Sequence, residues 1–179
     1  MITDFFAAEY RTENIRTDAL MYLYDPEGER VAYSSTTDND NPVWVAKVEN
    51  SKKLPMQFIP VDNNIPVYRS DGNEESTCDG MILYTTDPVD PTLARPEGVA
   101  FVELKNMRKG WIPKAVKQLQ TTVKIFKASH PATTLIFQFA YAANSRHPQF
   151  HASQKDRMQR FFEETGFHLL IQNTVHIPE

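Results

Sequence analysis

The chain reads Gly-Val-Ala-Phe-Val-Glu-Leu-Lys at residues 98–105, an apolar run that ends in a Glu-x-Lys pattern. A second apolar run, Cys-Asp-Gly-Met-Ile-Leu-Tyr at residues 78–84, precedes it, and both predict buried strands. Strand side chains alternate between faces, so Glu103 and Lys105 project from the same face of the sheet. Asp79, in the earlier run, adds a second carboxylate. Two carboxylates and an ammonium group are costly to bury without a partner. A divalent metal ion is the natural partner.

Length and composition are those of a globular protein. The 179 residues are 41% hydrophobic and 23% charged, enough for one domain over residues 1–179 with a sizeable core. The single cysteine, Cys78, excludes an internal disulfide and a cysteine-rich zinc site, and is expected to be a small core residue. No apolar run is long enough to span a membrane, and the first residues carry no secretory signal. We therefore expect a cytoplasmic protein without a membrane partner.

Charge is distributed unevenly along the chain. Residues 1–103 contain 19 acidic and 8 basic residues, whereas residues 104–155 contain no acidic residue. The basic residues in the second segment are Lys105, Arg108, Lys109, Lys114, Lys117, Lys124, Lys127, Arg146 and Lys155. Such asymmetry indicates an anionic partner. The alternative is that the lysines only form the solvated face of a helix.

The first 70 residues predict a strand-rich portion with loop insertions. A short helix is expected over residues 1–11, and the turn at residues 25–28 predicts a hairpin between strands 19–24 and 30–33. Further strands are expected at residues 43–48, 56–61 and 65–68.

Residues 71–179 predict an α/β core. Pro113 suits the first turn of a helix over residues 113–128, whose apolar stripe has helical spacing. A buried strand is expected at residues 133–141, and Ser153 with Asp156 predicts the start of a helix that ends near Gly166. Residues 167–177 predict a strand, or a tight hairpin through residues 172–173. Strands that alternate with helices favour α/β layering.

The two apolar strands suggest a chemistry if they are neighbours in one sheet. Asp79 and Glu103 then come within reach of one metal ion, and Lys105 stands further along the same face. Hard oxygen ligands suit Mg²⁺ or Mn²⁺, which lower the pKa of a bound water and neutralise charge on a phosphoryl oxygen. Lys105 adds a positive charge beside the nucleophile or the phosphate. These groups together predict a phosphodiester hydrolase without a covalent enzyme intermediate.

The same residues resemble the PD-(D/E)XK superfamily of restriction-endonuclease-like nucleases over about residues 76–143. The resemblance lies in Cys78-Asp79-Gly80, in Phe101-Val102-Glu103-Leu104-Lys105 and in a following helix with Lys117-Gln118-Leu119. It implies that Asp79 and Glu103 bind the metal, that Lys105 assists the attacking water, and that Gln118 matches a helix glutamine near the site. The main-chain carbonyl of Val102 or Leu104 is a further expected ligand. Glu9 is the candidate for an additional acid from the N-terminal part.

Each candidate has a simpler reading. Glu-x-Lys on a strand is usually a solvated edge pair, although the apolar flanks argue against that here. Gln118 can be a boundary residue between helix and sheet. His147 and His151 have metal-like spacing only on a helix, which Pro148 disfavours. Trp44 and Trp111 are expected to be core aromatics, with base stacking by Trp111 as the alternative.

Together these observations predict a restriction-endonuclease-like mixed sheet flanked by helices, with a strand-rich N-terminal elaboration. The expected function is Mg²⁺- or Mn²⁺-dependent cleavage of nucleic acid, with DNA preferred and little intrinsic sequence specificity. The residues expected to attract the backbone are Arg108, Lys109, Lys114, Lys117 and Arg146. By the resemblance, a homodimer or larger complex and a role in prokaryotic genome defence or repair are expected. The alternative is a non-enzymatic interaction protein with a degenerate nuclease-like fold that binds a protein partner.

Overall fold

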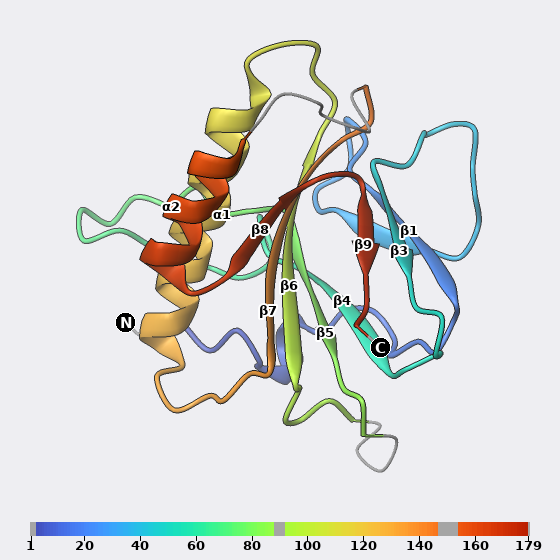
Figure 1. The fold of residues 1–179 in the computed structure, drawn as a ribbon, viewed down its shortest axis with the longest axis horizontal. Coiled ribbons are helices and arrows are strands. Elements are labelled where there is room, and N and C mark those ends of the chain that lie inside the picture. Colours follow the sequence, from blue (N-terminus) through green and yellow to red (C-terminus); the bar gives the residue numbers. More distant parts are fainter. Residues whose placement is uncertain (1–2, 88–91, 147–153, 179) are drawn as a thin grey trace.

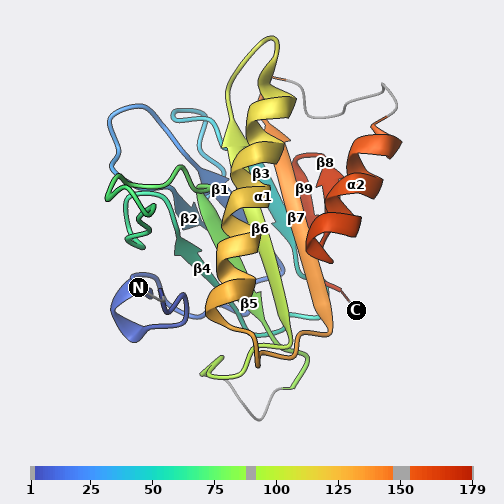
Figure 2. The same cartoon turned by 90° about the vertical axis from the view of Figure 1, so that its left-hand side faces the viewer.

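The computed structural model describes residues 3–87, 92–146 and 154–178, and these form a mixed α/β fold in three layers. Two helices, α1 (Trp111–Ser129) and α2 (Lys155–Thr165), cover one face of a five-stranded sheet (Figures 1 and 2). A four-stranded sheet covers the opposite face of the five-stranded sheet. The predicted α/β layering is therefore confirmed.

The five-stranded sheet has the order β4-β5-β6-β7-β8. Its strands are β4 (Met56–Pro60), β5 (Gly80–Tyr84), β6 (Gly98–Lys105), β7 (Phe137–Asn144) and β8 (His168–Ile171). The pairs β4–β5 and β5–β6 are antiparallel, whereas β6–β7 and β7–β8 are parallel. Helix α1 forms the crossover from β6 to β7, and α2 forms the crossover from β7 to β8.

The four-stranded sheet has the order β2-β1-β3-β9. Its strands are β1 (Leu20–Tyr24), β2 (Tyr33–Ser35), β3 (Ala46–Glu49) and β9 (Thr174–His176). The predicted β1–β2 hairpin is confirmed, with Tyr24 opposite Tyr33, although its second strand covers residues 33–35 and not 30–33. Because β9 pairs in parallel with β3, the last strand of the chain joins the N-terminal portion to the rest.

Strands β5 and β6 are apolar throughout because both of their faces are covered. Met81 and Phe101 pack in the core beneath the helices, whereas Ile82 and Val102 pack in a second core against the four-stranded sheet. Alternate side chains of each strand thus pack in two separate cores. A polar side chain in either strand is therefore buried and requires a specific partner or role.

Helix α1 buries the predicted stripe, and the buried set includes Ile112, Val116, Leu119, Val123 and Phe126. Pro113 lies in its first turn, where the missing N–H costs no hydrogen bond. Helix α2 ends at Gly166, which adopts the left-handed conformation, as predicted. Ser153, the expected cap of α2, lies outside the described residues. None of the helices among the described residues is both long enough and apolar enough to cross a bilayer.

Several expected elements differ from the structure. Residues 172–173 do not form a hairpin, because β8 and β9 belong to different sheets. The strand expected at residues 133–141 is β7, which starts at Phe137 because Ile136 is 67% exposed. Residues 65–68 form no strand beyond one isolated bridge at Tyr68. In the described part of the N-terminal segment, the expected helix is reduced to the single 3₁₀ turn η1 (Ala8–Tyr10).

Candidate metal centre

The register of β5 and β6 brings Asp79 and Glu103 together. The two strands are antiparallel neighbours, as predicted, with Gly80 opposite Val102. One residue further, Asp79 stands opposite Glu103, and both continue the series of side chains that faces the helices. Gly80 permits this pairing because a Cβ atom there would collide with the ring of Phe58 on β4. The two carboxylates therefore lie on one face of the sheet.

The main chain of β6 holds the Asp79 carboxylate. The N–H of Leu104 donates a hydrogen bond to Asp79 Oδ2 at 2.6 Å. Strand β5 begins opposite Val102, so Leu104 has no β5 residue as a ladder partner. The N–H and C=O of one strand residue point to the same side of the strand. The Leu104 carbonyl, an expected metal ligand, is therefore directed to the same edge as Asp79.

Glu103 is fully buried, with 0% of its surface exposed. Its Oε1 atom forms an ion pair with Nζ of Lys105. Its Oε2 atom has no hydrogen-bond partner among the described residues. A buried carboxylate oxygen without a partner is strongly destabilising. A cation at this position would satisfy it, so the donor set fits a hard divalent metal ion.

Helix α1 fixes Lys105 in place. Nζ of Lys105 donates to Oε1 of Gln118 at 3.1 Å, and Nε2 of Gln118 donates to the Thr77 carbonyl at 3.0 Å. One turn further, Thr122 Oγ1 accepts the N–H of Cys78 at 2.8 Å. Gln118 therefore lies at the boundary between helix and sheet and also contacts the site lysine. Cys78 is buried, as expected.

The electrostatics of the site favour uptake of a cation. Burial, followed by the charge of Asp25, raises the pKa of Asp79 to about 7, although the Leu104 N–H bond and Lys105 act in the opposite direction. Burial, followed by Asp79, raises the pKa of Glu103 well above its ordinary value. Burial lowers the pKa of Lys105, but Glu103 and other acids outweigh it and raise the pKa overall. The pair of carboxylates therefore holds a proton where a metal ion could stand.

Two further acids, which the sequence pattern does not indicate, act on this site. Asp25 follows β1 in the four-stranded sheet, and Asp62 follows β4 in the five-stranded sheet; both raise the pKa of Asp79. The sequence marks Asp25 only as a turn residue, and its position just after a strand is the one local feature that points to the site. Glu9, which was expected to be an additional acid of the site from the N-terminal part, is exposed in η1 and raises the pKa of Tyr10.

A cleft of about 660 Å³ opens beside the site, between loops of both sheets. Asp25 lines one side, and Leu104, Lys105 and Arg146 line it from the ends of β6 and β7. Nε of Arg146 donates to Oδ1 of Asn106 at 2.7 Å, which holds the guanidinium at the rim. Solvent reaches Lys105, whose side chain is 15% exposed, while Glu103 stays covered.

The other basic residues expected to bind nucleic acid are spread over the surface. Arg108 and Lys109 line a different pocket of about 370 Å³ at the start of α1. Lys114 and Lys117 are exposed on α1 itself. The structure therefore places Arg146 at the cleft but does not bring the five residues into one patch.

The remaining candidate residues from the sequence are two histidines and two tryptophans. His147 and His151 lie outside the described residues. Trp111 is 3% exposed, which confirms it as a core aromatic. Trp44 was also expected in the core, but it is half-buried at the surface, where its Nε1 donates to Asp38 at 3.0 Å.

The candidate ligands are thus two carboxylates and one main-chain carbonyl. Within residues 3–87, 92–146 and 154–178, no group of three or more His, Cys, Asp and Glu side chains is arranged to hold a metal ion. Mg²⁺ commonly binds through one or two carboxylates and keeps several waters, so the smaller set suffices.

No protein-family model, curated protein or solved structure matches this chain.

Proposed function

We propose that this protein is a metal-dependent nuclease that hydrolyses phosphodiester bonds of nucleic acid, with DNA as the preferred substrate. The observation that carries the proposal is the Glu103 carboxylate, which is fully buried, half unpaired and opposite Asp79 on one sheet face. A cluster of carboxylates with raised pKa values beside a cleft is typical of functional sites. The mixed sheet with both helices on one face is compatible with the PD-(D/E)XK resemblance.

Asp79, Glu103 and the Leu104 carbonyl are the groups that would hold Mg²⁺ or Mn²⁺. When bound, such an ion acts as a Lewis acid toward phosphate and makes a water molecule more acidic. Asp79 contributes a carboxylate that the Leu104 N–H already orients, so little rotamer entropy is lost when the ion binds.

Lys105 contributes a fixed positive charge next to the carboxylates. Its ammonium group is held by Glu103 and Gln118, so it needs no reorganisation when the substrate arrives. During hydrolysis, water adds to phosphorus and loses a proton, while the bond to the leaving sugar oxygen breaks and that oxygen is protonated. Lys105 stabilises the negative charge that develops on the phosphoryl oxygen. Gln118 acts through Lys105 and is a positioning residue.

The cleft beside Lys105 gives the substrate a place to bind. Arg146 at its rim supplies a planar fork of donors that suits phosphate. Among the described residues that line the cleft, Arg146 and Lys105 are suited to phosphate rather than to base edges, so little intrinsic sequence specificity is expected.

Incubation of purified protein with supercoiled plasmid in MnCl₂, MgCl₂ or EDTA tests the proposal. Wild type is expected to cut DNA with either metal and not in EDTA, and Glu103→Gln is expected to cut about 1000-fold more slowly. Glu49→Gln is the matched control, because Glu49 is also a strand glutamate paired with a lysine but lies in the other sheet. A parallel assay with RNA of the same sequence tests the preference for DNA.

Absence of cleavage together with absence of Mn²⁺ binding would contradict the proposal and favour the alternative of a non-enzymatic protein that binds a protein partner. Cleavage that persists in Glu103→Gln would indicate a contaminating nuclease or a different site.

A further inference from the structure

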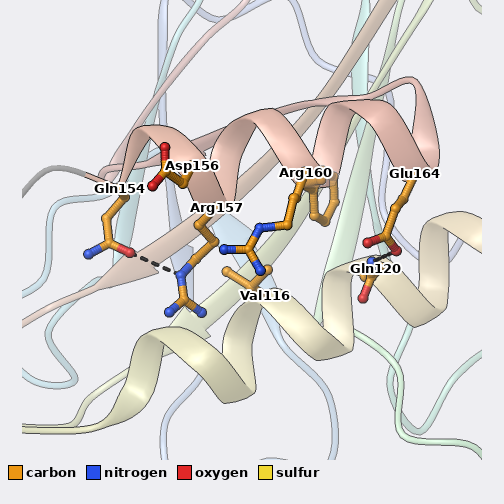
Figure 3. Close-up of a pocket in the computed structure, with 8 residues that line it drawn as sticks. Val116, Gln120, Gln154, Asp156, Arg157, Arg160 and Glu164 are labelled. Atoms are coloured by element: carbon orange, nitrogen blue, oxygen red, sulfur yellow. Dashed lines mark hydrogen bonds between the residues drawn. The ribbon is translucent and has the colours of Figure 1, made fainter.

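A groove of about 430 Å³ lies between α1 and α2, on the helical side of the molecule (Figure 3). Val116 of α1 and Phe161 of α2 contribute apolar side chains to its lining. Gln154, Arg157 and Arg160 contribute polar groups from the first turns of α2. None of these residues belongs to the candidate metal centre.

Two arginines project into this groove. Figure 3 shows the guanidinium groups of Arg157 and Arg160 in the space between α2 and α1. Residues three apart on a helix are neighbours, so these two like charges repel each other unless an anion lies between them. Nε of Arg157 donates to Oε1 of Gln154 at 3.0 Å. Among the described residues, no ion pair joins either guanidinium to a carboxylate.

The acids near the groove do not neutralise these arginines. Glu164 is already paired with Lys124 at 2.9 Å and accepts a hydrogen bond from Gln120. Asp156 lies on α2, and Figure 3 shows its carboxylate on the side of the helix away from the guanidinium of Arg157. Asp156 and Glu164 also line the groove, but Glu164 is already paired with Lys124, so two guanidinium groups face one remaining carboxylate.

The groove continues toward the catalytic side of the molecule. The pocket of about 370 Å³ at the start of α1 shares Gln154 and Arg157 with it, and adds Lys109 and the apolar residues Ile112 and Pro113. This pocket begins at residue 108, three residues after Lys105 in the chain. The cleft beside the candidate metal centre and this pocket are lined by different residues of the loop between β6 and α1.

From this arrangement we infer that the groove between α1 and α2 binds phosphate groups of a single-stranded nucleic acid. The substrate class rests on the proposed nuclease function, but the binding site is separate from the metal centre. Arginine guanidinium groups match phosphate oxygens in a bidentate manner. A positively charged groove that follows the backbone is a usual feature of single-strand binding. The groove volume of about 430 Å³ is within the range of pockets for small ligands, so it can hold part of a single strand and cannot enclose a duplex.

The experiment measures binding of a fluorescently labelled oligothymidylate by anisotropy, in EDTA so that no metal-dependent cleavage takes place. The double variant Arg157→Gln/Arg160→Gln is compared with wild type. For a single strand, the slope of log K against log salt becomes smaller by about 0.7 for each phosphate contact that is removed. The double variant is therefore expected to bind about 25-fold more weakly at about 0.1 M salt, with a slope smaller by about 1.4.

Lys155→Gln is the matched control, because it removes one positive charge from an exposed site on the same helix outside the groove. It is expected to leave affinity and slope close to those of wild type. Arg160→Lys keeps the charge and is expected to retain most of the affinity. Far-ultraviolet circular dichroism and Tm of each variant verify that α2 remains folded.

Equal affinities for wild type and the double variant would overturn the inference, as would an equal loss in Lys155→Gln. A loss seen only with duplex DNA would overturn the assignment to a single strand. Competition by inorganic phosphate, at concentrations that leave ionic strength unchanged, distinguishes a site for free phosphate from one that needs the polymer. Because binding is measured without metal, it can succeed or fail independently of cleavage.

Discussion

Two Glu/Lys pairs occupy strands of this protein with the same spacing and opposite consequences. Lys47 and Glu49 on β3 form an ion pair at 2.9 Å, and their side chains are 32% and 41% exposed. Glu103 and Lys105 on β6 also form an ion pair, but their side chains are 0% and 15% exposed. The order of the two residues is reversed between the strands, and β6 is buried almost throughout whereas one face of β3 is partly exposed.

Because Glu103 is buried and Glu49 is partly exposed, the pKa values of the two carboxyl groups shift in opposite directions. At Glu49, the hydrogen bond from Lys47 lowers the pKa of the carboxyl, as expected for a solvated pair. At Glu103, burial and Asp79 raise the pKa despite the adjacent Lys105. A surface pair needs no further partner, whereas the buried pair leaves one carboxylate oxygen unpaired. Burial therefore separates an ordinary ion pair from a candidate site.

Removal of each glutamate charge should give the largest contrast. Glu103→Gln is expected to lower the rate of plasmid cleavage in Mn²⁺ by about 1000-fold, roughly 4 kcal/mol of transition-state stabilisation. Glu49→Gln is expected to retain the wild-type rate. Similar rates for the two variants would remove the distinction between the pairs.

Removal of the Asp79 charge should raise the stability of the metal-free protein, although it removes a candidate metal ligand. The unfolded chain releases the Asp79 proton near pH 4, whereas the folded state holds it up to about pH 7, so this group lowers stability as the pH rises between the two values. Asp79→Asn removes that charge and keeps an acceptor for the Leu104 N–H. After a discount for partial exposure, the gain at pH 8 is about 2 kcal/mol, or roughly 4–8 °C in Tm.

Differential scanning fluorimetry in EDTA at pH 8 measures this change, with Glu49→Gln as the control that should show no increase. Added Mn²⁺ should raise the Tm of wild type and leave that of Asp79→Asn unchanged. A lower Tm for Asp79→Asn in EDTA would contradict the electrostatic account.

Metal affinity should depend on pH through the same carboxylates. Because the pKa of Asp79 is about 7, a cation must displace a proton below that pH. Affinity for Mn²⁺ should fall at least tenfold between pH 8 and pH 6, with Glu103, whose pKa is also raised, adding to the loss. Isothermal titration calorimetry in two buffers of different ionisation enthalpy counts the protons released. Binding without proton release would show that these groups are not the ligands.

The smallest expected effect concerns Gln118, which contacts Lys105 and the Thr77 carbonyl. Gln118→Leu should lower the cleavage rate about fivefold, the value of roughly 1 kcal/mol for one hydrogen bond. Its affinity for Mn²⁺ should stay at the wild-type value, and its pH–rate profile should shift because Lys105 loses a neighbour. An unchanged rate and profile would identify Gln118 as only a packing residue between helix and sheet.

The strands that carry the site could be predicted from the sequence because burial on both faces leaves a clear pattern. The run at residues 98–105 is apolar at every position before Glu103, and a strand of this kind must be covered on both sides. The helix that follows shows a regular stripe, so its contact face was also predictable.

Other features depend on contacts that no local pattern records. Asp25 lies near the site only because the four-stranded sheet packs against the five-stranded sheet. Strand β9 has three residues, too few to indicate that its partner is β3. Strand β7 begins later than the Leu135–Phe137 run suggests, because Ile136, although apolar, is exposed to solvent.

The most direct test of the central claim is a crystal of the wild-type protein soaked in Mn²⁺ at pH 8, with anomalous scattering measured near the manganese edge. The account predicts one strong anomalous peak between the carboxylates of Asp79 and Glu103, absent from Glu103→Gln crystals and retained in Glu49→Gln. No peak at that position in fully soaked wild-type crystals, or an equal peak in Glu103→Gln, would contradict it.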